Sequence, residues 1–323
     1  MNNNNILEVK NLHTTFKSRD GSIEAIRGID FEVKRGEVLG IVGESGSGKS
    51  VTVSSIMRLL GRNVEISGEV LLDGKNLLDM TEKEMRSVRG KKISMIFQDP
   101  MTALNPVYTI GNQIKEAIKL HRKDIDNPTE YAVKLLEMVG ISDGKRRLKQ
   151  YPHEFSGGMR QRAVIAMALA SDPDILIADE PTTALDVTVQ AQILELIKKL
   201  TKERNMSTIL ITHDLGVVAD MCDRIIIMYA GRICEKGTVE EIFRTPMHEY
   251  TKGLLLAVPD GKAKKRLIPI EGTPLILKVL PKGCAFCTRC KSAMKICEVS
   301  QPETKVFSET HTSACWVNER PNA

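Results

Sequence analysis

The chain has 323 residues, of which 42% are hydrophobic and 27% are charged, and its formal net charge is +5. This composition is ordinary for a water-soluble protein, and the length allows one large core divided into two or three units. No apolar run approaches the roughly 20 residues of a membrane-spanning helix, and the first residues lack the basic and apolar parts of a secretion signal, so we expect a cytoplasmic protein.

Short strands are predicted near the amino terminus, at residues 6–9 and 29–33, with Gly21 and Gly36 marking turns. Phe16 lies close to them in a polar stretch. An aromatic ring here either stacks on an adenine base or covers the edge of the core, and the residues alone do not choose between these roles.

The segment Gly43-Glu44-Ser45-Gly46-Ser47-Gly48-Lys49-Ser50 has the G-x-x-x-x-G-K-[ST] pattern of a phosphate-binding loop. It lies between an apolar run at 38–42, predicted to be a buried strand, and a predicted helix at about 49–60. Its backbone N–H groups then converge on an anion at the positive end of the helix. We therefore expect Lys49 to reach the β/γ-phosphates of a nucleotide and the Ser50 hydroxyl to hold Mg²⁺. The predicted nucleotide-binding residues here are Gly43, Ser45, Gly46, Ser47, Gly48, Lys49, Ser50 and Val51.

Further along, a strand with a turn is predicted at 68–74 and a charged helix at 81–92. An apolar strand beginning at residue 93 then ends at Gln98. An amide beside a nucleotide site binds Mg²⁺ or water, although a strand end at the surface is the simpler interpretation of Gln98 alone. Apolar residues then recur at helical spacing from 106 to 149, which predicts a helical insertion.

A second helix start that favours anions follows the insertion. Ser156 is a good N-cap, and Gly157 and Gly158 leave the first-turn N–H groups unobstructed. Gln161 lies one turn further along the same predicted helix. A capped core helix without a ligand is the alternative interpretation.

Two carboxylates, Asp179 and Glu180, end an apolar run that begins at residue 175 and is predicted to be a buried strand. Burying a carboxylate is costly unless it meets a cation or hydrogen-bond donors. We therefore expect Asp179 to anchor hydrated Mg²⁺, and Glu180 to orient or deprotonate an attacking water.

The segment after these carboxylates predicts a helix beginning near Asp186 and a strand at 208–212 with His213 at its tip. A lone histidine in this position is more often structural than functional. A hairpin at 225–237 and helical segments to about 256 follow.

In this order, the motifs resemble the ATPase cassette of ATP-binding-cassette transporters over residues 6 to about 255. The Ser-Gly-Gly-x-x-Gln segment is the specific part, because many phosphate-loop proteins lack it. The resemblance implies an α/β fold: a RecA-like phosphate-loop NTPase core, an antiparallel β subdomain and a helical subdomain at about 100–160. Two such cassettes pack head to tail, so that the Ser-Gly-Gly helix of one caps ATP on the phosphate loop of the other.

The resemblance also implies roles for single residues. Gln98 becomes a hinge, a γ-phosphate sensor and a Mg²⁺ ligand, and His213 becomes a γ-phosphate contact. Phe16 becomes the adenine-stacking residue, and Asp186 a contact across the dimer interface. Ser156, Gly157, Gly158 and Gln161 belong to the segment that caps the partner's nucleotide.

Residues 256–323 form a predicted cysteine-rich C-terminal region, which we call the tail. It carries 11 Lys/Arg and 6 Asp/Glu, which accounts for the whole net charge, and five of the seven cysteines. In a reducing cytoplasm such clustering favours metal or cluster ligation over disulfides. Spacing alone favours the trio Cys284, Cys287 and Cys290 as ligands.

The tail resembles the C-terminal region of ATPase subunits of bacterial oligopeptide, dipeptide and nickel importers, which often hold a [4Fe–4S] cluster. Cys284, Cys290, Cys297 and Cys315 match the cluster cysteines by position, whereas Cys287 departs from the pattern. Zinc in four thiolates is the chemical alternative, and free cysteines in a small folded tail are another.

Together, the resemblances imply an ATPase at the cytoplasmic face of the cell membrane that uses ATP and Mg²⁺ to drive import of oligopeptides or dipeptides. The implied partners are a second, non-identical cassette, two transmembrane permease subunits and a solute-binding protein. Nickel or another small solute is one alternative, and a soluble cassette acting on nucleic acid or ribosomes is another. The basic residues 262–266 permit contact with nucleic acid, but a solvated linker or a surface near anionic lipid explains them equally well, so we expect no nucleic acid.

Overall fold

The computed structural model describes residues 4–19, 21–183, 185–257, 269–275, 277 and 280–319. The chain divides into two compact units. The first comprises Met1–Lys34, Val38–Leu78 and Ile211–Ala323, and the second comprises Arg35–Glu37 and Asp79–Leu210. The phosphate loop and the tail therefore belong to the same unit. The basic residues 262–266 lie outside the described residues, and the predicted boundary at 255 stays a prediction.

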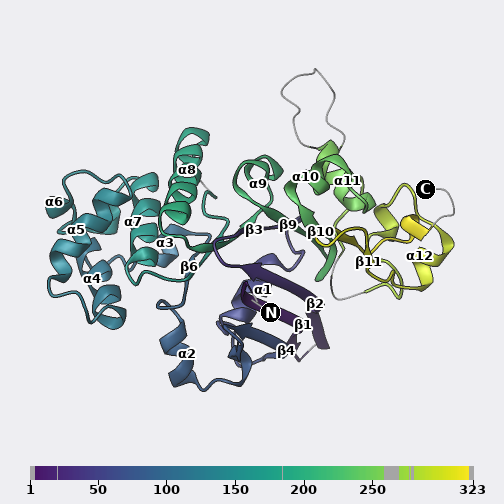
Figure 1. The fold of residues 1–323 in the computed structure, drawn as a ribbon, viewed down its shortest axis with the longest axis horizontal. Helices are drawn as coiled ribbons and strands as arrows, with labels where there is room; N and C mark the ends of the chain where they lie inside the picture. The colour runs from purple at the N-terminus through teal and green to yellow at the C-terminus, as the bar shows by residue number, and fades with distance from the viewer. Residues whose placement is uncertain are drawn as a thin grey trace. The chain divides into compact units, whose positions relative to one another are not determined.

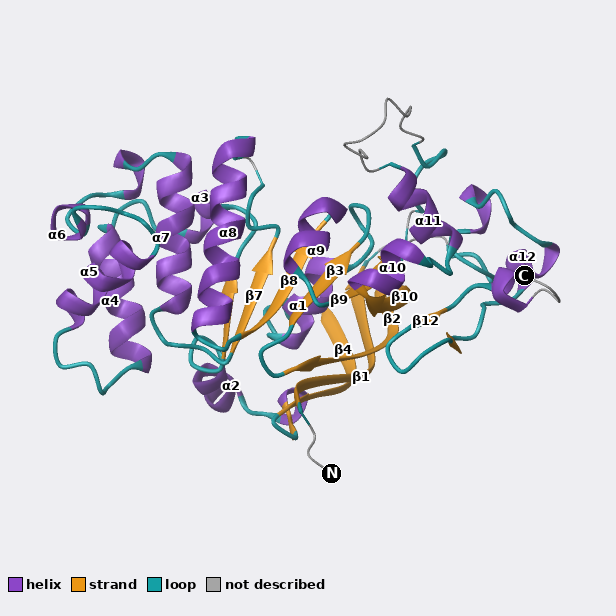
Figure 2. Cartoon of the chain, turned by 45° about the horizontal axis from the view of Figure 1, so that its top comes forward, coloured by secondary structure: helices purple, strands orange, loops and turns teal. Residues whose placement is uncertain are grey.

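An antiparallel sheet forms one part of the first unit (Figure 2). Its strands, in the order β2-β1-β4-β5, are β1 (Asn5–Ser18), β2 (Gly21–Lys34), β4 (Val64–Leu72) and β5 (Lys75–Asn76). The prediction of short strands at 6–9 and 29–33 is wrong in length, because β1 and β2 each run for 14 residues. A bulge between Val9 and Leu12 breaks the two-residue alternation on which such a prediction depends.

A second group of strands in the first unit follows the predicted buried pattern. β3 (Val38–Val42) pairs in parallel with β9 (Arg224–Tyr229), and β10 (Arg232–Thr238) pairs with β9 as the predicted hairpin. The strand β9 is buried throughout. The tail extends this group, because β12 (Thr312–Ser313) pairs with β10 and β11 (Lys305–Val306) pairs with β12.

Helices of the first unit include α1, which begins at the phosphate loop, and α11, which precedes the tail. Their bounds are α1 (Lys49–Ile56), α9 (Leu215–Met221), α10 (Val239–Arg244), α11 (Glu249–Leu256) and α12 (Lys295–Val299), with the 3₁₀ turns η3 (Cys287–Arg289) and η4 (Trp316–Glu319). Phe286 of the tail packs against Tyr229 and Tyr250, with ring centroids 5.4 and 5.2 Å away. The tail thus shares the apolar core of its unit.

The second unit carries a parallel pair of strands and the predicted helical insertion (Figure 1). β6 (Ile93–Ile96) pairs with β7 (Ile175–Asp179), and β8 (Ser207–Thr212) leads back to the first unit. The helices are α2 (Glu82–Val88), α3 (Pro100–Ala103), α4 (Ile110–His121), α5 (Pro128–Met138), α6 (Gly144–Arg147), α7 (Gly157–Leu169) and α8 (Val187–Glu203), with the 3₁₀ turn η2 (Pro152–Glu154) among them. The 3₁₀ turn η1 (Leu77–Asp79) lies where the chain passes from the first unit to the second. Within the part of the chain that the structure describes, no helix is both long and apolar enough to cross a bilayer.

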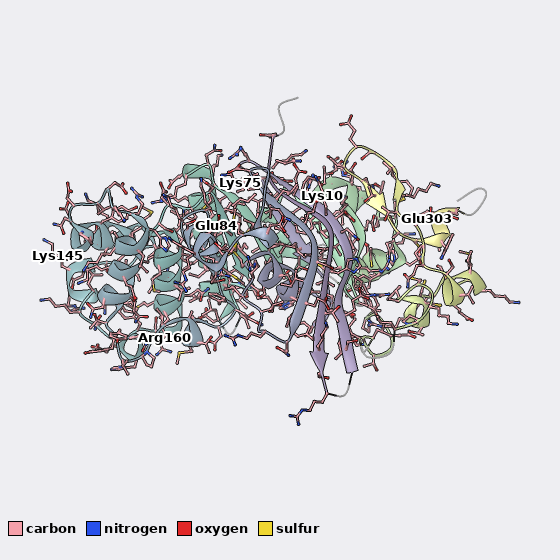
Figure 3. All side chains as sticks on the ribbon, turned by 90° about the horizontal axis from the view of Figure 1, so that it is seen from below. Lys10, Lys75, Glu84, Lys145, Arg160 and Glu303 are labelled. Carbon is pink, nitrogen blue, oxygen red and sulfur yellow. The ribbon has the colours of Figure 1, made fainter. Side chains whose placement is uncertain are left out.

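Local sequence sets where several of these helices begin. Glu84, which Figure 3 labels, and Thr81 form a reciprocal capping box at the start of α2: the Glu84 N–H donates to Thr81 Oγ1 at 3.3 Å, and the Thr81 N–H donates to Glu84 Oε2 at 2.7 Å. Thr109 caps α4, and Asn127 caps α5 ahead of a proline in its first turn. The insertion therefore starts where its polar residues can satisfy free N–H groups.

Candidate functional site

The phosphate loop links β3 to α1, as its motif requires. Lys49 is buried, and its ammonium donates to the carbonyl oxygens of Gly43 at 2.7 Å and Glu44 at 3.0 Å. These contacts curl the loop around the lysine and hold its charge inside the loop. A fixed cation beside a helix N-terminus is an arrangement that suits a polyphosphate.

Two glycines of the loop occupy positions that a side chain cannot. A Cβ on Gly43 would lie 2.3 Å from the carbonyl oxygen of Met228. Gly48 has φ +107°, and its Cβ would lie 2.8 Å from Ile26 Cδ1. The loop also contains a buried hydroxyl, Ser47 Oγ, that has no hydrogen-bond partner among the described residues. A nucleotide phosphate is a ligand that this orphaned donor fits.

The two carboxylates of the second unit follow β7, as predicted. Asp179 is buried, and Glu180 has a left-handed backbone with φ +44°. Strained backbone of this kind persists where the surrounding structure holds it, often at functional sites. The Glu180 Oε2 accepts hydrogen bonds from Gln98 Nε2 and Thr183 Oγ1, both at 3.0 Å. Two predicted site residues, Gln98 and Glu180, are therefore in contact.

The second predicted anion site begins at α7. Ser156 is its N-cap, and its hydroxyl accepts from the Met159 N–H at 3.3 Å, which confirms the predicted start of the helix. A Cβ on Gly158 would lie 2.7 Å from Val189 Cγ1, so this glycine allows α7 to approach α8 closely. Gln161 is buried and donates to the Pro181 carbonyl at 2.6 Å, so it braces the turn after Glu180.

The remaining predicted nucleotide contacts are placed as follows. Asp186 is exposed and caps α8 through a bond from the Val189 N–H at 2.9 Å. His213 is exposed directly after β8, and Phe16 is partly exposed in β1. Phe16 and His213 belong to the first unit and Asp186 to the second, and their roles toward nucleotide stay predictions.

The cysteines of the tail influence one another electrostatically. Burial, with smaller contributions from Cys297, Cys315 and Cys290, raises the pKa of Cys284 to about 12. Burial also raises the pKa of Cys290 to about 11, again with contributions from Cys315 and Cys297. Cys287 interacts with Cys297 and with Glu298, and it is less buried than Cys284. Each of the five tail cysteines therefore interacts with at least one other tail cysteine, and Cys297 interacts with all the rest.

The side chains of these described cysteines are not arranged as a binding site for a single metal ion. Across the described ranges, no three His, Cys, Asp or Glu side chains are arranged to hold a metal ion. The tail is instead fastened by other contacts, among them the buried pair in which His311 Nε2 lies 2.7 Å from Glu235 Oε1 of β10. The cysteine-rich metal or cluster site expected from the sequence is therefore not confirmed.

Two residues next to the phosphate loop are missing from the sequence-based prediction. The Tyr250 hydroxyl accepts from the Glu44 N–H at 2.9 Å, and Arg289 of the tail forms an ion pair with the Glu44 carboxylate. No local motif marks either residue. Only the fold brings them to the loop.

Comparison with known proteins identifies the class. The family described as "ABC transporter" matches residues 26–183. Among solved structures, the chain is similar to the ATP-binding cassette MJ0796, a dimer in a post-hydrolysis state bound to ADP and Pi, with 30% identity and a TM-score of 0.65 over 72% of this chain and 98% of that one. The fold and the phosphate loop therefore define an ATP-binding-cassette ATPase.

The match of the tail and the similarity to full-length relatives show to which family of these ATPases the chain belongs. The family described as "Oligopeptide/dipeptide transporter, C-terminal region" matches residues 234–297. The chain is 52% identical to the dipeptide transport ATP-binding protein DppD of Bacillus subtilis, over 98% of this chain and 95% of that protein. It is 53% identical to the oligopeptide transport ATP-binding protein OppD of the same organism, over 97% of this chain and 88% of that protein. The chain belongs to this family of transport ATP-binding proteins, and it is an ATPase that uses ATP and Mg²⁺.

Proposed function

We propose that this chain is the ATPase subunit that energises import of oligopeptides or dipeptides through a membrane permease. The observation that carries the proposal is the match of both parts of the chain, cassette and tail, to peptide transport ATP-binding proteins at about half identity over nearly the full length. Its partners are a second cassette, two permease subunits and a solute-binding protein. The chain then works at the cytoplasmic face of the membrane as a peripheral subunit.

Each predicted residue has a role in the ATPase cycle. Lys49 binds the β/γ-phosphates, and Ser50, Gln98 and Asp179 are the side chains that hold Mg²⁺, which neutralises phosphate charge when bound. Phe16 stacks on adenine, and the N-terminus of α7 with Asp186 meets the nucleotide of the partner cassette. His213 contacts the γ-phosphate. ATP that bridges two cassettes stabilises the closed dimer through its extra affinity for that state.

Glu180 is the group that takes the proton from the attacking water. Its carboxylate accepts two hydrogen bonds, from Gln98 and Thr183, which hold it in place as a general base. Gln98 also fixes the direction of the carboxylate. Movement of Gln98 on ATP binding would then change the orientation of the base, which links the hinge role of this residue to hydrolysis.

We further propose that Cys284, Cys290, Cys297 and Cys315 hold a [4Fe–4S] cluster. Support comes from the interactions of these four thiols with one another and from the family resemblance of the tail, which matches these four cysteines by position and leaves Cys287 outside the set. A [4Fe–4S] cluster takes one thiolate on each iron, so four of the five tail cysteines suffice, and zinc in four thiolates is the chemical alternative. A structural role suits the cluster best, since ATP hydrolysis transfers no electron.

The cluster is tested by anaerobic purification and measurement of iron, sulfide and zinc in cysteine-to-serine variants. Cys287→Ser should keep iron and sulfide, whereas Cys297→Ser or Cys315→Ser should lose them. The reverse pattern would overturn the ligand set. Stoichiometric zinc without sulfide would overturn the cluster.

Peptide import is tested in cells that depend on this subunit for uptake. Uptake of labelled dipeptide and oligopeptide should stop when Glu180→Gln replaces the wild-type chain, and nickel uptake should be unchanged. A pull-down from detergent extract should recover permease subunits. Recovery of ribosomes or nucleic acid without permease would support the soluble alternative instead.

A further inference from the structure

A carboxylate lies within the phosphate loop itself. Glu44 is its second residue, and its negative charge opposes the binding of a polyphosphate nearby. The structure pairs this charge with a buried cation of the tail. Arg289 Nη1 donates to Glu44 Oε2 at 2.5 Å, and Arg289 Nη2 donates to Glu44 Oε1 at 3.0 Å. The pair is bidentate, the geometry in which an arginine holds a carboxylate most firmly.

Arg289 is itself fixed by groups other than Glu44. Its side chain is only 4% exposed, and its Nε donates to the Glu271 carbonyl at 3.0 Å. The guanidinium lies 5.9 Å from the ring centroids of both Tyr229 and Phe286. The direction of Arg289 is therefore set by the tail and the core, and Glu44 must adapt to it.

The backbone of Glu44 is also held by a residue outside the loop. Its N–H donates to the hydroxyl of Tyr250 at 2.9 Å, and Tyr250 is fully buried against Tyr229, with centroids 4.8 Å apart. Side chain and backbone of Glu44 are thus both anchored outside the loop. The first turn of the loop takes its shape from α11 and the tail.

We propose that Arg289 is a positioning residue for ATP binding: it neutralises Glu44 and fixes the phosphate loop, so that affinity for ATP depends on the folded tail. The proposal rests on ATP binding at this loop. Coupling between two sites is reciprocal, so bound ATP must in turn stabilise the tail around Arg289. The tail then has a function in the ATPase cycle beyond its own folding.

The test is equilibrium binding of a non-hydrolysable ATP analogue with Mg²⁺ to the purified full chain. Arg289→Met should weaken binding about tenfold, a typical coupling between sites, because Glu44 is left uncompensated beside the phosphates. The loss should be smaller for ADP, which carries less charge. Lys291→Met is the matched control: it removes a tail cation that is 70% exposed and lies 3.5 Å from Glu271, and affinity should stay at the wild-type value.

The double variant Glu44→Gln with Arg289→Met separates positioning from a purely structural role. Removal of both charges should recover most of the lost affinity. If Arg289 only holds the tail together, the double variant will bind as weakly as Arg289→Met, and the proposal fails. Should Arg289→Met not fold, Arg289→Lys keeps the charge without the bidentate contact and should give an intermediate loss, whereas wild-type affinity would overturn the proposal.

Hydrogen exchange gives the reciprocal measurement. The nucleotide analogue should slow exchange of backbone amides at residues 284–290 in the wild type and in Lys291→Met, but not in Arg289→Met. Equal protection in all three overturns the coupling. A wild-type chain that binds no nucleotide contradicts the ATPase function itself, which keeps that failure distinct from the failure of the Arg289 proposal.

Discussion

Acid should destabilise the first unit through His248. This side chain is 2% exposed, and it caps α11 because its Nδ1 accepts the N–H of Tyr250 at 3.0 Å. Burial lowers the pKa of His248 to about 4, against the opposing effects of Glu235 and Glu249 and with a small contribution from Lys252. An acceptor nitrogen cannot carry a proton, so protonation breaks the cap as well as charging a buried ring.

The direction and size of this loss of stability follow from the pKa of His248 in the folded chain and in the unfolded chain. The unfolded chain takes up the proton below its ordinary value of about 6.5, whereas the folded chain resists until about 4, so stability is lost as the pH falls between these values. The loss from this group is about 2 kcal/mol at pH 5 and about 3 kcal/mol at pH 4, since each pKa unit is worth roughly 1.4 kcal/mol. Below pH 4 the histidine is protonated in both states and adds little more.

The assay is urea unfolding from pH 7 to pH 4 of the wild type and of His248→Asn, whose side chain can still cap the helix without titrating. The wild type should lose about 3 kcal/mol more than the variant over this range. His153→Asn, which removes an exposed histidine, is the control and should follow the wild type. Parallel loss in the wild type and His248→Asn would refute the reasoning.

Three further predictions concern the ATPase cycle. Lys49→Ala should weaken ATP binding by roughly 100-fold, because charge-assisted contacts to phosphate are lost, and equilibrium binding with a fluorescent ATP analogue measures this. Glu180→Gln should keep binding but slow phosphate release by roughly 10² to 10⁴, since an amide cannot accept the proton of water; near-normal turnover would show that another group is the base. The isolated chain should hydrolyse ATP slowly, and a cysteine placed at Ser47 should crosslink to the Ser-Gly-Gly helix of a partner only when ATP is present. Crosslinking that ignores nucleotide would contradict the head-to-tail dimer.

The sequence predicts the parts of this molecule whose cause is local. The phosphate loop follows from glycines at positions such as Gly43 and Gly48, where the fold leaves no room for a side chain, together with the apolar strand before it. The start of α7 follows from the N-cap Ser156. The length of β1 was not predictable in this way, because its bulge shifts the buried face and its outer residues are polar.

Contacts between residues far apart in the sequence cannot be predicted from local sequence patterns. Glu44 and Arg289 are 245 positions apart, in a chain with 46 Lys/Arg and 41 Asp/Glu, so charge alone offers no way to pair them. What selects Arg289 is burial: its neighbours Tyr229 and Phe286 exclude water, and a buried guanidinium must find a carboxylate. The same burial makes the pair matter for function, because a charge left alone beside the phosphate loop is poorly screened. A conservative exchange of Arg289 for lysine should therefore cost affinity even though the net charge is kept.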